Sequence, residues 1–161
     1  MTQNLKQKIV QSKEVFNAAQ GLLARREHSQ LELMQKLQKK SFDELIISEV
    51  LLKLSQMDYQ SDQRYAAARL RNLTNKGYGP NYIKQYLNQR GISSTLIENC
   101  FDNFDINWFN CVQKVWQKKY NLVPADLKTK AKQQNFLYYR GFDGGLINKL
   151  FRNLKIKESR L

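Results

Sequence analysis

The chain has 161 residues, a formal net charge of +13 and 42% hydrophobic residues, a composition that can bury a core and excludes an intrinsically disordered protein. No apolar run approaches the roughly 18 residues of a membrane span, and the N-terminal residues lack the apolar block of a secretory signal. We therefore expect a cytoplasmic protein with no membrane contact, in which Cys100 and Cys111 stay reduced.

The positive charge is concentrated in the last third of the chain. Residues 111–161 contain 12 lysines and arginines against three acids, whereas residues 1–60 contain nine against seven. A field of this kind favours an acidic partner, either a nucleic acid or a protein surface. The alternative interpretation is a solvated basic face that keeps the protein soluble.

Apolar residues recur at spacings of three and four, as in Leu33 and Leu37, which predicts amphipathic helices. Ser29 and Glu32 have the spacing of a capping box. Three further N-terminal signals precede apolar helical patterns: Asp43, Ser93 and Asp143. In chain order, the predicted helices span 10–26, 29–40, 43–56, 62–76, 80–90, 94–103, 105–120, 124–140 and 143–154.

The segment NKGYGPNYIKQYLNQRGI, residues 75–92, predicts a helix, a tight turn and a second helix. Gly77 can end the first helix in the left-handed conformation, and Gly79 can cap the next. Pro80 fits the first turn of a helix, and Gly91 provides a second stop. The cations of this segment are expected to project from one rigid edge: Lys76, Lys84 and Arg90.

The same pattern returns at a fixed spacing. SQLELMQKLQKKSF (29–42) aligns with GPNYIKQYLNQRGI (79–92) at an offset of 50, and after another 50 residues Leu137 matches Leu87 and Gly141 matches Gly91. We predict an all-α fold of three tandem three-helix repeats that form an elongated, curved body. The repeats are placed at residues 1–58 with an N-terminal segment, 59–104, and 105–161 with a basic C-terminal tail.

The residue types needed for catalysis are scarce. His28 is the only histidine and is expected to be a surface or capping residue, and Asp102 and Asp105 are typical of an interhelix loop. We therefore predict no enzyme activity, no metal and no cofactor.

Binding is the better-supported role. Arg25 and Arg26 can engage a carboxylate or phosphate bidentately, although arginines also suit a helix C-terminus. Tyr138 and Tyr139 can stack on a ligand beside Arg140, unless one tyrosine packs between helices. The candidate partner-binding residues are Arg25, Arg26, Lys76, Lys84, Arg90, Lys118, Lys119, Lys128, Lys132 and Arg140.

Four segments together carry a resemblance that covers residues 10 to 155: LLARREHSQLELMQKL (22–37), SDQRYAAARL (61–70), NKGYGPNYIKQYLNQRGI (75–92) and AKQQNFLYYRGF (131–142). They resemble the bacterial regulatory protein RecX family, which is built from three tandem three-helix repeats. One departure is Ser41, which stands where the later repeats have Gly91 and Gly141.

The resemblance implies a monomeric modulator of the recombinase RecA. Such a protein binds RecA and RecA filaments on single-stranded DNA, and it suppresses strand exchange, ATP hydrolysis and co-protease activity. It thereby restrains recombination and the SOS response. The alternative is a basic helical module that binds single-stranded or double-stranded DNA directly, without RecA contact.

Overall fold

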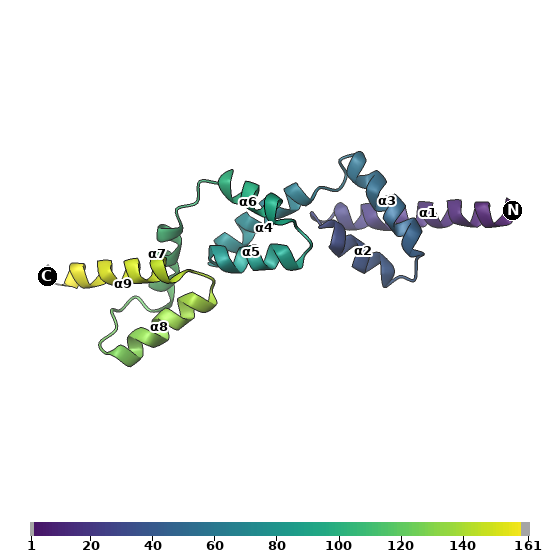
Figure 1. Ribbon diagram of the computed structural model, residues 1–161. Helices are drawn as coiled ribbons and strands as arrows, with labels where there is room; N and C mark the ends of the chain where they lie inside the picture. Colours follow the sequence, from purple (N-terminus) through teal and green to yellow (C-terminus); the bar gives the residue numbers. More distant parts are fainter. Residues whose placement is uncertain (1, 159–161) are drawn as a thin grey trace. The chain divides into compact units, whose positions relative to one another are not determined.

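The computed structural model describes residues 2–158, with side chains described for residues 5–154. Within this part of the chain the backbone forms nine α-helices and no strand, which confirms the all-α prediction (Figure 1). The helices are α1 (Thr2–Leu23), α2 (Gln30–Gln38), α3 (Glu44–Gln56), α4 (Asp62–Asn75), α5 (Pro80–Gln89), α6 (Ser94–Asp102), α7 (Trp108–Lys119), α8 (Leu127–Tyr139) and α9 (Gly144–Glu158). They follow one another as three triplets.

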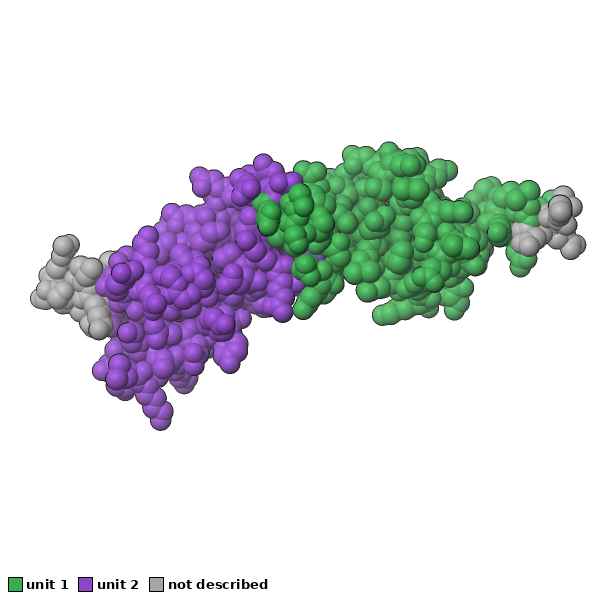
Figure 2. Space-filling model, viewed as in Figure 1, with its two compact units in different colours: residues 1–68, 88–98 green, residues 69–87, 99–161 purple. Residues whose placement is uncertain are grey.

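The chain packs as two compact units, which Figure 2 shows in different colours. Unit 1 comprises residues 1–68 and 88–98, and unit 2 comprises residues 69–87 and 99–161. Helices α1 to α3 therefore lie in unit 1 and α7 to α9 in unit 2, while the middle triplet contributes to both. The boundaries after residues 58 and 104 and the elongated, curved body stay predictions. The expected basic tail lies beyond the residues whose side chains are described.

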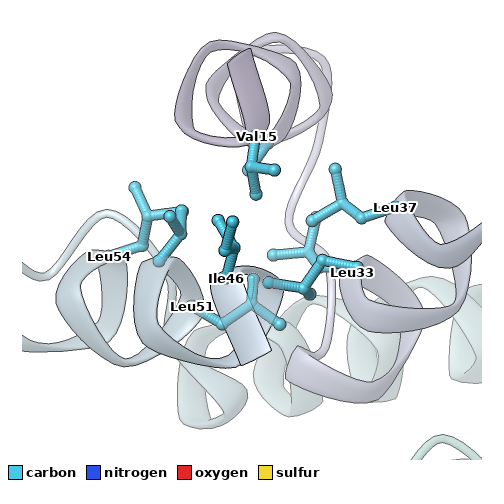
Figure 3. Close-up of a cluster of buried hydrophobic side chains, with 9 residues drawn as sticks. Val15, Leu33, Leu37, Ile46, Leu51 and Leu54 are labelled. Carbon is cyan, nitrogen blue, oxygen red and sulfur yellow. The ribbon is translucent and has the colours of Figure 1, made fainter. Parts of the chain in front are cut away.

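The core of unit 1 forms where α1, α2 and α3 meet. Leu33 and Leu37 of α2 are fully buried, and Ile46 and Leu51 of α3 are nearly so. Figure 3 shows Val15 pointing from α1 into this cluster. Burying one such side chain contributes about 1.5–3 kcal/mol, so the apolar stripes of the three helices account for their packing.

The core of unit 2 follows the same pattern in α7, α8 and α9. It is built from Val112, Trp116, Leu137, Phe142, Ile147, Leu150, Phe151 and Leu154. The predicted 50-residue period is confirmed by burial, because Leu37, Leu87 and Leu137 are each 0% exposed. Equivalent positions in the three repeats are thus all buried.

Several predicted helix ends are wrong. Helix α1 begins at Thr2, not at residue 10, and residues 2–10 contain no glycine or proline that would interrupt it; it ends at Leu23, not at residue 26. Helices α7 and α8 begin later than residues 105 and 124. Their N-caps explain the delay: the side chain of Asn107 accepts a hydrogen bond from the Asn110 amide, and that of Asp126 accepts one from Thr129.

The helix ends at Gly77, Gly91 and Gly141 all have left-handed backbone, with φ of 82°, 79° and 90°. Ser41 adopts the same conformation, with φ of 60°, at the equivalent place in the first triplet. A Cβ atom at Gly91 would lie 2.9 Å from Cβ of Leu31, whereas Ser41 is exposed. Serine is therefore tolerated at residue 41 because only the backbone angle, and not a close neighbour, opposes a side chain there.

Candidate partner-binding groove

A basic groove in unit 2 brings together cations from three parts of the chain. It has a volume of about 530 Å³ and is lined by residues 74–77 at the end of α4, by one side of α7 and by the end of α8. Its cations are Lys76, Lys114, Lys118, Lys119 and Arg140, and none of the described residues that line it is acidic. A cleft lined by one sign of charge focuses the field and attracts anionic groups.

Helix α7 supplies three of these cations. Lys114 and Lys118 are four residues apart and share a face of the helix, and Lys119 is its last residue, where a cation complements the helix dipole. The helix is fixed by Trp116, whose buried indole N–H donates a 2.8 Å hydrogen bond to Oε1 of Gln133 on α8. The lysine row therefore projects from a rigid element rather than from a loop.

Arg140, at the end of α8, is held in place by three contacts. Its guanidinium donates a 3.0 Å hydrogen bond to the carbonyl of Lys76. Its Cζ atom lies 5.0 Å from the ring centroid of Tyr78 and 5.4 Å from that of Phe136. Nζ of Lys119 lies 5.8 Å from the same Phe136 ring. These cation–π contacts order the groove before any partner arrives.

Backbone hydrogen bonds bring the turn after α4 against the end of α8. The amide of Gly79 donates to the carbonyl of Arg140 at 2.7 Å, and the amide of Asn81 donates to that of Gly141 at 3.0 Å. A Cβ atom at Gly79 would lie only 2.5 Å from the backbone of Gly141. The two glycines permit this close approach, which places Arg140 beside Lys76.

The structure separates the ten predicted binding residues. Four of them line the groove: Lys76, Lys118, Lys119 and Arg140. Lys128 and Lys132 lie on an exposed face of α8, and Arg25 is exposed after α1. Nζ of Lys84 lies 5.1 Å from the Phe101 ring centroid, so this cation has its own local partner. Lys114 was missed, although its spacing of four from Lys118 could have indicated it.

Arg26 and Arg90 converge on Glu32 in unit 1. The Glu32 carboxylate accepts hydrogen bonds from Arg26 at 3.0 Å, from the Tyr65 hydroxyl at 3.1 Å and from Arg90 at 3.3 Å. Burial opposes ionisation, but the bonds from Arg26 and Tyr65 prevail and lower the pKa of Glu32. Of the predicted capping box, the Ser29 half is present, because Oγ of Ser29 accepts from the Glu32 amide at 3.1 Å.

The structure contradicts the surface position expected for His28 and the alternative interpretation of Tyr138 and Tyr139. His28 is buried rather than on the surface, with 3% exposure, and its Nδ1–H donates to the carbonyl of Arg26 at 3.0 Å. Neither Tyr138 nor Tyr139 packs between helices, since they are 65% and 81% exposed. The neighbouring Arg140 is part of the groove, so the three residues have different environments.

The chemistry of the groove is that of anion binding. Cys111 lines it, and burial raises the pKa of this thiol, which disfavours the reactive thiolate. Across the described residues, no group of three or more His, Cys, Asp or Glu side chains could hold a metal ion. In the same part of the chain, no helix is long and apolar enough to cross a bilayer.

Fold and groove define the class as an all-α protein of three-helix repeats with a cationic, ordered groove. Family models for the first, second and third three-helix domains of RecX match residues 16–54, 61–100 and 109–151. The chain therefore belongs to the RecX family, as its sequence resemblance indicated.

Relatives named regulatory protein RecX match most of the chain. The protein from Legionella pneumophila (strain Corby) is 36% identical over 143 residues, which cover 88% of this chain and 95% of that one. The protein from Ectopseudomonas mendocina is 36% identical over 139 residues, covering 86% and 93%. The crystal structure of RecX from Lactobacillus salivarius shares the fold, with a TM-score of 0.79 and 24% identity over 92% of this chain and 99% of that one.

Proposed function

We propose that the protein binds the recombinase RecA, and RecA filaments on single-stranded DNA, and thereby inhibits strand exchange, ATP hydrolysis and co-protease activity. Membership of a family named for regulation supports a regulatory role. The observation that carries the binding step is the groove with five cations and no acidic lining among its described residues. In this proposal the protein acts as a cytoplasmic monomer without catalysis of its own, and it restrains recombination and the SOS response.

The groove suits an acidic partner because Arg140 and the helix that carries its lysines are held in place in advance. Lys114 and Lys118 lie on a helix that is anchored in the core, and Arg140 is fixed by a hydrogen bond and two aromatic rings. Pre-organisation lowers the entropy cost of binding, so carboxylates or phosphates meet donors already in position.

Charge reversal in the groove tests the proposal. The variant Lys114→Glu/Lys118→Glu/Lys119→Glu changes exposed side chains on one helix and leaves Arg140 in place. We expect it to require about tenfold more protein than the wild type for half-inhibition of the RecA DNA-dependent ATPase, because like charges then face the acidic partner. The measurement is a titration of ATP hydrolysis at fixed RecA and single-stranded DNA.

The matched control is Lys6→Glu/Lys8→Glu/Lys13→Glu on α1, which changes net charge equally at exposed positions in unit 1. Both variants should keep the helical circular dichroism spectrum and melting temperature of the wild type. If the groove variant inhibits as well as the wild type while the α1 variant fails, the groove is not the RecA-binding surface.

The alternative function is direct DNA binding without RecA contact, which the basic character of α7 and α8 also favours. Co-sedimentation with RecA filaments on single-stranded DNA separates the two. If the protein still sediments with the filaments at a salt concentration that abolishes its binding to free DNA, the RecA proposal is supported. If binding to filaments and binding to free DNA are lost at the same salt concentration, the alternative is supported.

A further inference from the structure

An aromatic and basic face on α8 is separate from the groove. Lys128, Lys132, Asn135 and Tyr139 follow one another at spacings of four, three and four, so they share one side of the helix. All four side chains are exposed. Helix α8 contacts α7 and α9, and Gln133 and Leu137, on its opposite side, are buried.

Tyr139 has a ring that is open to a ligand. Its side chain is 81% exposed, and the aromatic contact that the structure shows for it is with Tyr138, at 6.3 Å between centroids. The two rings meet at 74°, so a flat ligand that stacks on one cannot stack on the other. Tyr139, and not Tyr138, shares its helix face with the lysines.

The aromatic rings beside the groove are already in contact with cationic side chains. Tyr78 stacks against Tyr82 at 4.1 Å and also contacts Arg140, and Phe136 contacts both Arg140 and Lys119. Their faces are occupied by groups of the protein itself. Tyr139 is therefore better suited than these rings to receive a base.

The charge of α8 determines which kind of ligand fits. Its sequence, LKTKAKQQNFLYY, contains three lysines and no acidic residue. From Lys128 to Tyr139 the helix advances about 17 Å, over which an extended strand presents several phosphates and bases in succession. Lysines can bind phosphates, and an open aromatic ring beside them can stack on a base. Together these groups bind single-stranded nucleic acid with little sequence preference.

We propose that the outer face of α8 is a binding site for single-stranded nucleic acid, in which one base stacks on Tyr139 and neighbouring phosphates bind Lys132 and Lys128. The site does not depend on RecA and goes beyond the proposed regulatory function. In a duplex the bases are already stacked on one another, so only the two lysines would remain useful.

The test measures anisotropy of fluorescently labelled 20-mers with the full chain in the absence of RecA. With oligo(dT), Tyr139→Ala should weaken binding by about 5- to 150-fold, the range for loss of one stacked base. Tyr139→Phe keeps the ring and should bind as the wild type does. Lys132→Gln should lower the slope of log K against log salt by about 0.7.

Three comparisons make the result decisive. Leu127→Ala removes another highly exposed apolar side chain from α8, with 84% exposure but no ring, and should leave affinity unchanged. A 20-bp duplex should bind Tyr139→Ala and wild type equally. A titration with oligo(rU) compares RNA with DNA. Equal losses of affinity in Tyr139→Ala for oligo(rU) and oligo(dT) would confirm that base and phosphate, not the sugar, are recognised.

Several outcomes would overturn the site. The first is equal affinity of Tyr139→Ala and wild type for oligo(dT). The second is a loss of affinity in Leu127→Ala as large as that in Tyr139→Ala, and the third is a loss of affinity of Tyr139→Ala for the duplex as large as that for oligo(dT). Weakened inhibition of RecA by Tyr139→Ala with unchanged oligonucleotide binding would show that this face binds protein instead. Because the groove variant is assayed separately, either conclusion can fail without the other.

Discussion

At the scale of single residues, Glu32 shows how one partly buried carboxylate can connect distant parts of the chain. It lies in the first turn of α2, yet its partners are Arg26 before that helix, Tyr65 on α4 and Arg90 after α5. Partial burial opposes ionisation, but the hydrogen bonds from Arg26 and Tyr65 favour the charged form and lower the pKa of Glu32. Removing the carboxylate would take away the partner that Arg26 and Arg90 share.

His28 gives the molecule a predictable sensitivity to acid. Burial lowers the pKa of His28 below its ordinary 6.5, and the nearby charges of Arg26 and Lys36 act in the same direction, while the hydrogen bond to the Arg26 carbonyl and the charge of Glu32 oppose them. The unfolded chain therefore takes up this proton first. The contribution of neutral His28 to stability is complete above pH 6.5. It is lost as pH falls from 6.5 toward the lower pKa of His28 in the folded state.

We expect a lower melting temperature at pH 5.5 than at pH 7.5, and a smaller difference in His28→Gln. His28 is the only histidine, so no other histidine contributes in this window. Glu32 acts separately, because its contribution is lost only as pH falls below 4.5. Thermal melts of both proteins provide the measurement, and an unchanged pH dependence in His28→Gln would contradict the assignment.

Sequence reasoning at this scale identified cations but not their partners. The charge count located Lys118, Lys119 and Arg140 because it requires no knowledge of contacts. It could not show that Glu32 engages Arg26 and Arg90, since those pairs are separated along the chain and depend on how the helices pack. The burial of His28 was missed for the same reason.

At the scale of the elements, the turn glycines have two roles. They permit the left-handed backbone, and in the second and third triplets they also leave room for a neighbouring helix. Leu31 at the start of α2 approaches Gly91, and Tyr82 at the start of α5 approaches Gly141. Ser41, in the first triplet, is exposed, so only its left-handed backbone opposes a side chain there.

Alanine substitutions test the two roles together. We expect Gly91→Ala to destabilise by about 2 kcal/mol or more, because a positive φ alone costs about 1–2 kcal/mol and the new Cβ also meets Leu31. Ser41→Ala should change stability by less than about 0.5 kcal/mol, since the position is exposed and already carries a side chain. Urea denaturation checks both. Equal effects would show that neither the positive φ nor the approach of Leu31 opposes a side chain at residue 91.

Helix identity and core positions followed from the sequence because burial repeats with a period that the chain displays. Leu37, Leu87 and Leu137 were matched by spacing alone and are all buried. Helix starts were less accurate, because Asn107 and Asp126 act as N-caps a few residues after positions that looked equally suitable. A cap depends on local backbone geometry, which periodicity does not specify.

At the scale of the whole molecule, the net charge of +13 and the local field of the groove make separable contributions to binding. Long-range attraction depends on total charge and is screened over about 10 Å at 0.1 M salt, whereas contacts within the groove persist. The two triple variants distinguish them, because each reversal removes two charges and three reversals take both proteins from +13 to +7. They differ only in where the charge is lost.

We therefore expect the association rate with RecA filaments on single-stranded DNA to fall for both variants at low salt. At higher salt the α1 variant should approach the wild-type rate and affinity, while Lys114→Glu/Lys118→Glu/Lys119→Glu should still dissociate faster, because contacts in the groove itself are lost. Surface plasmon resonance over a salt series measures both rates. If the two variants remain indistinguishable at every salt concentration, binding follows total charge and the groove has no specific part in it. A defect of the groove variant that persists at high salt, with the α1 variant restored, would place the acidic partner against α7.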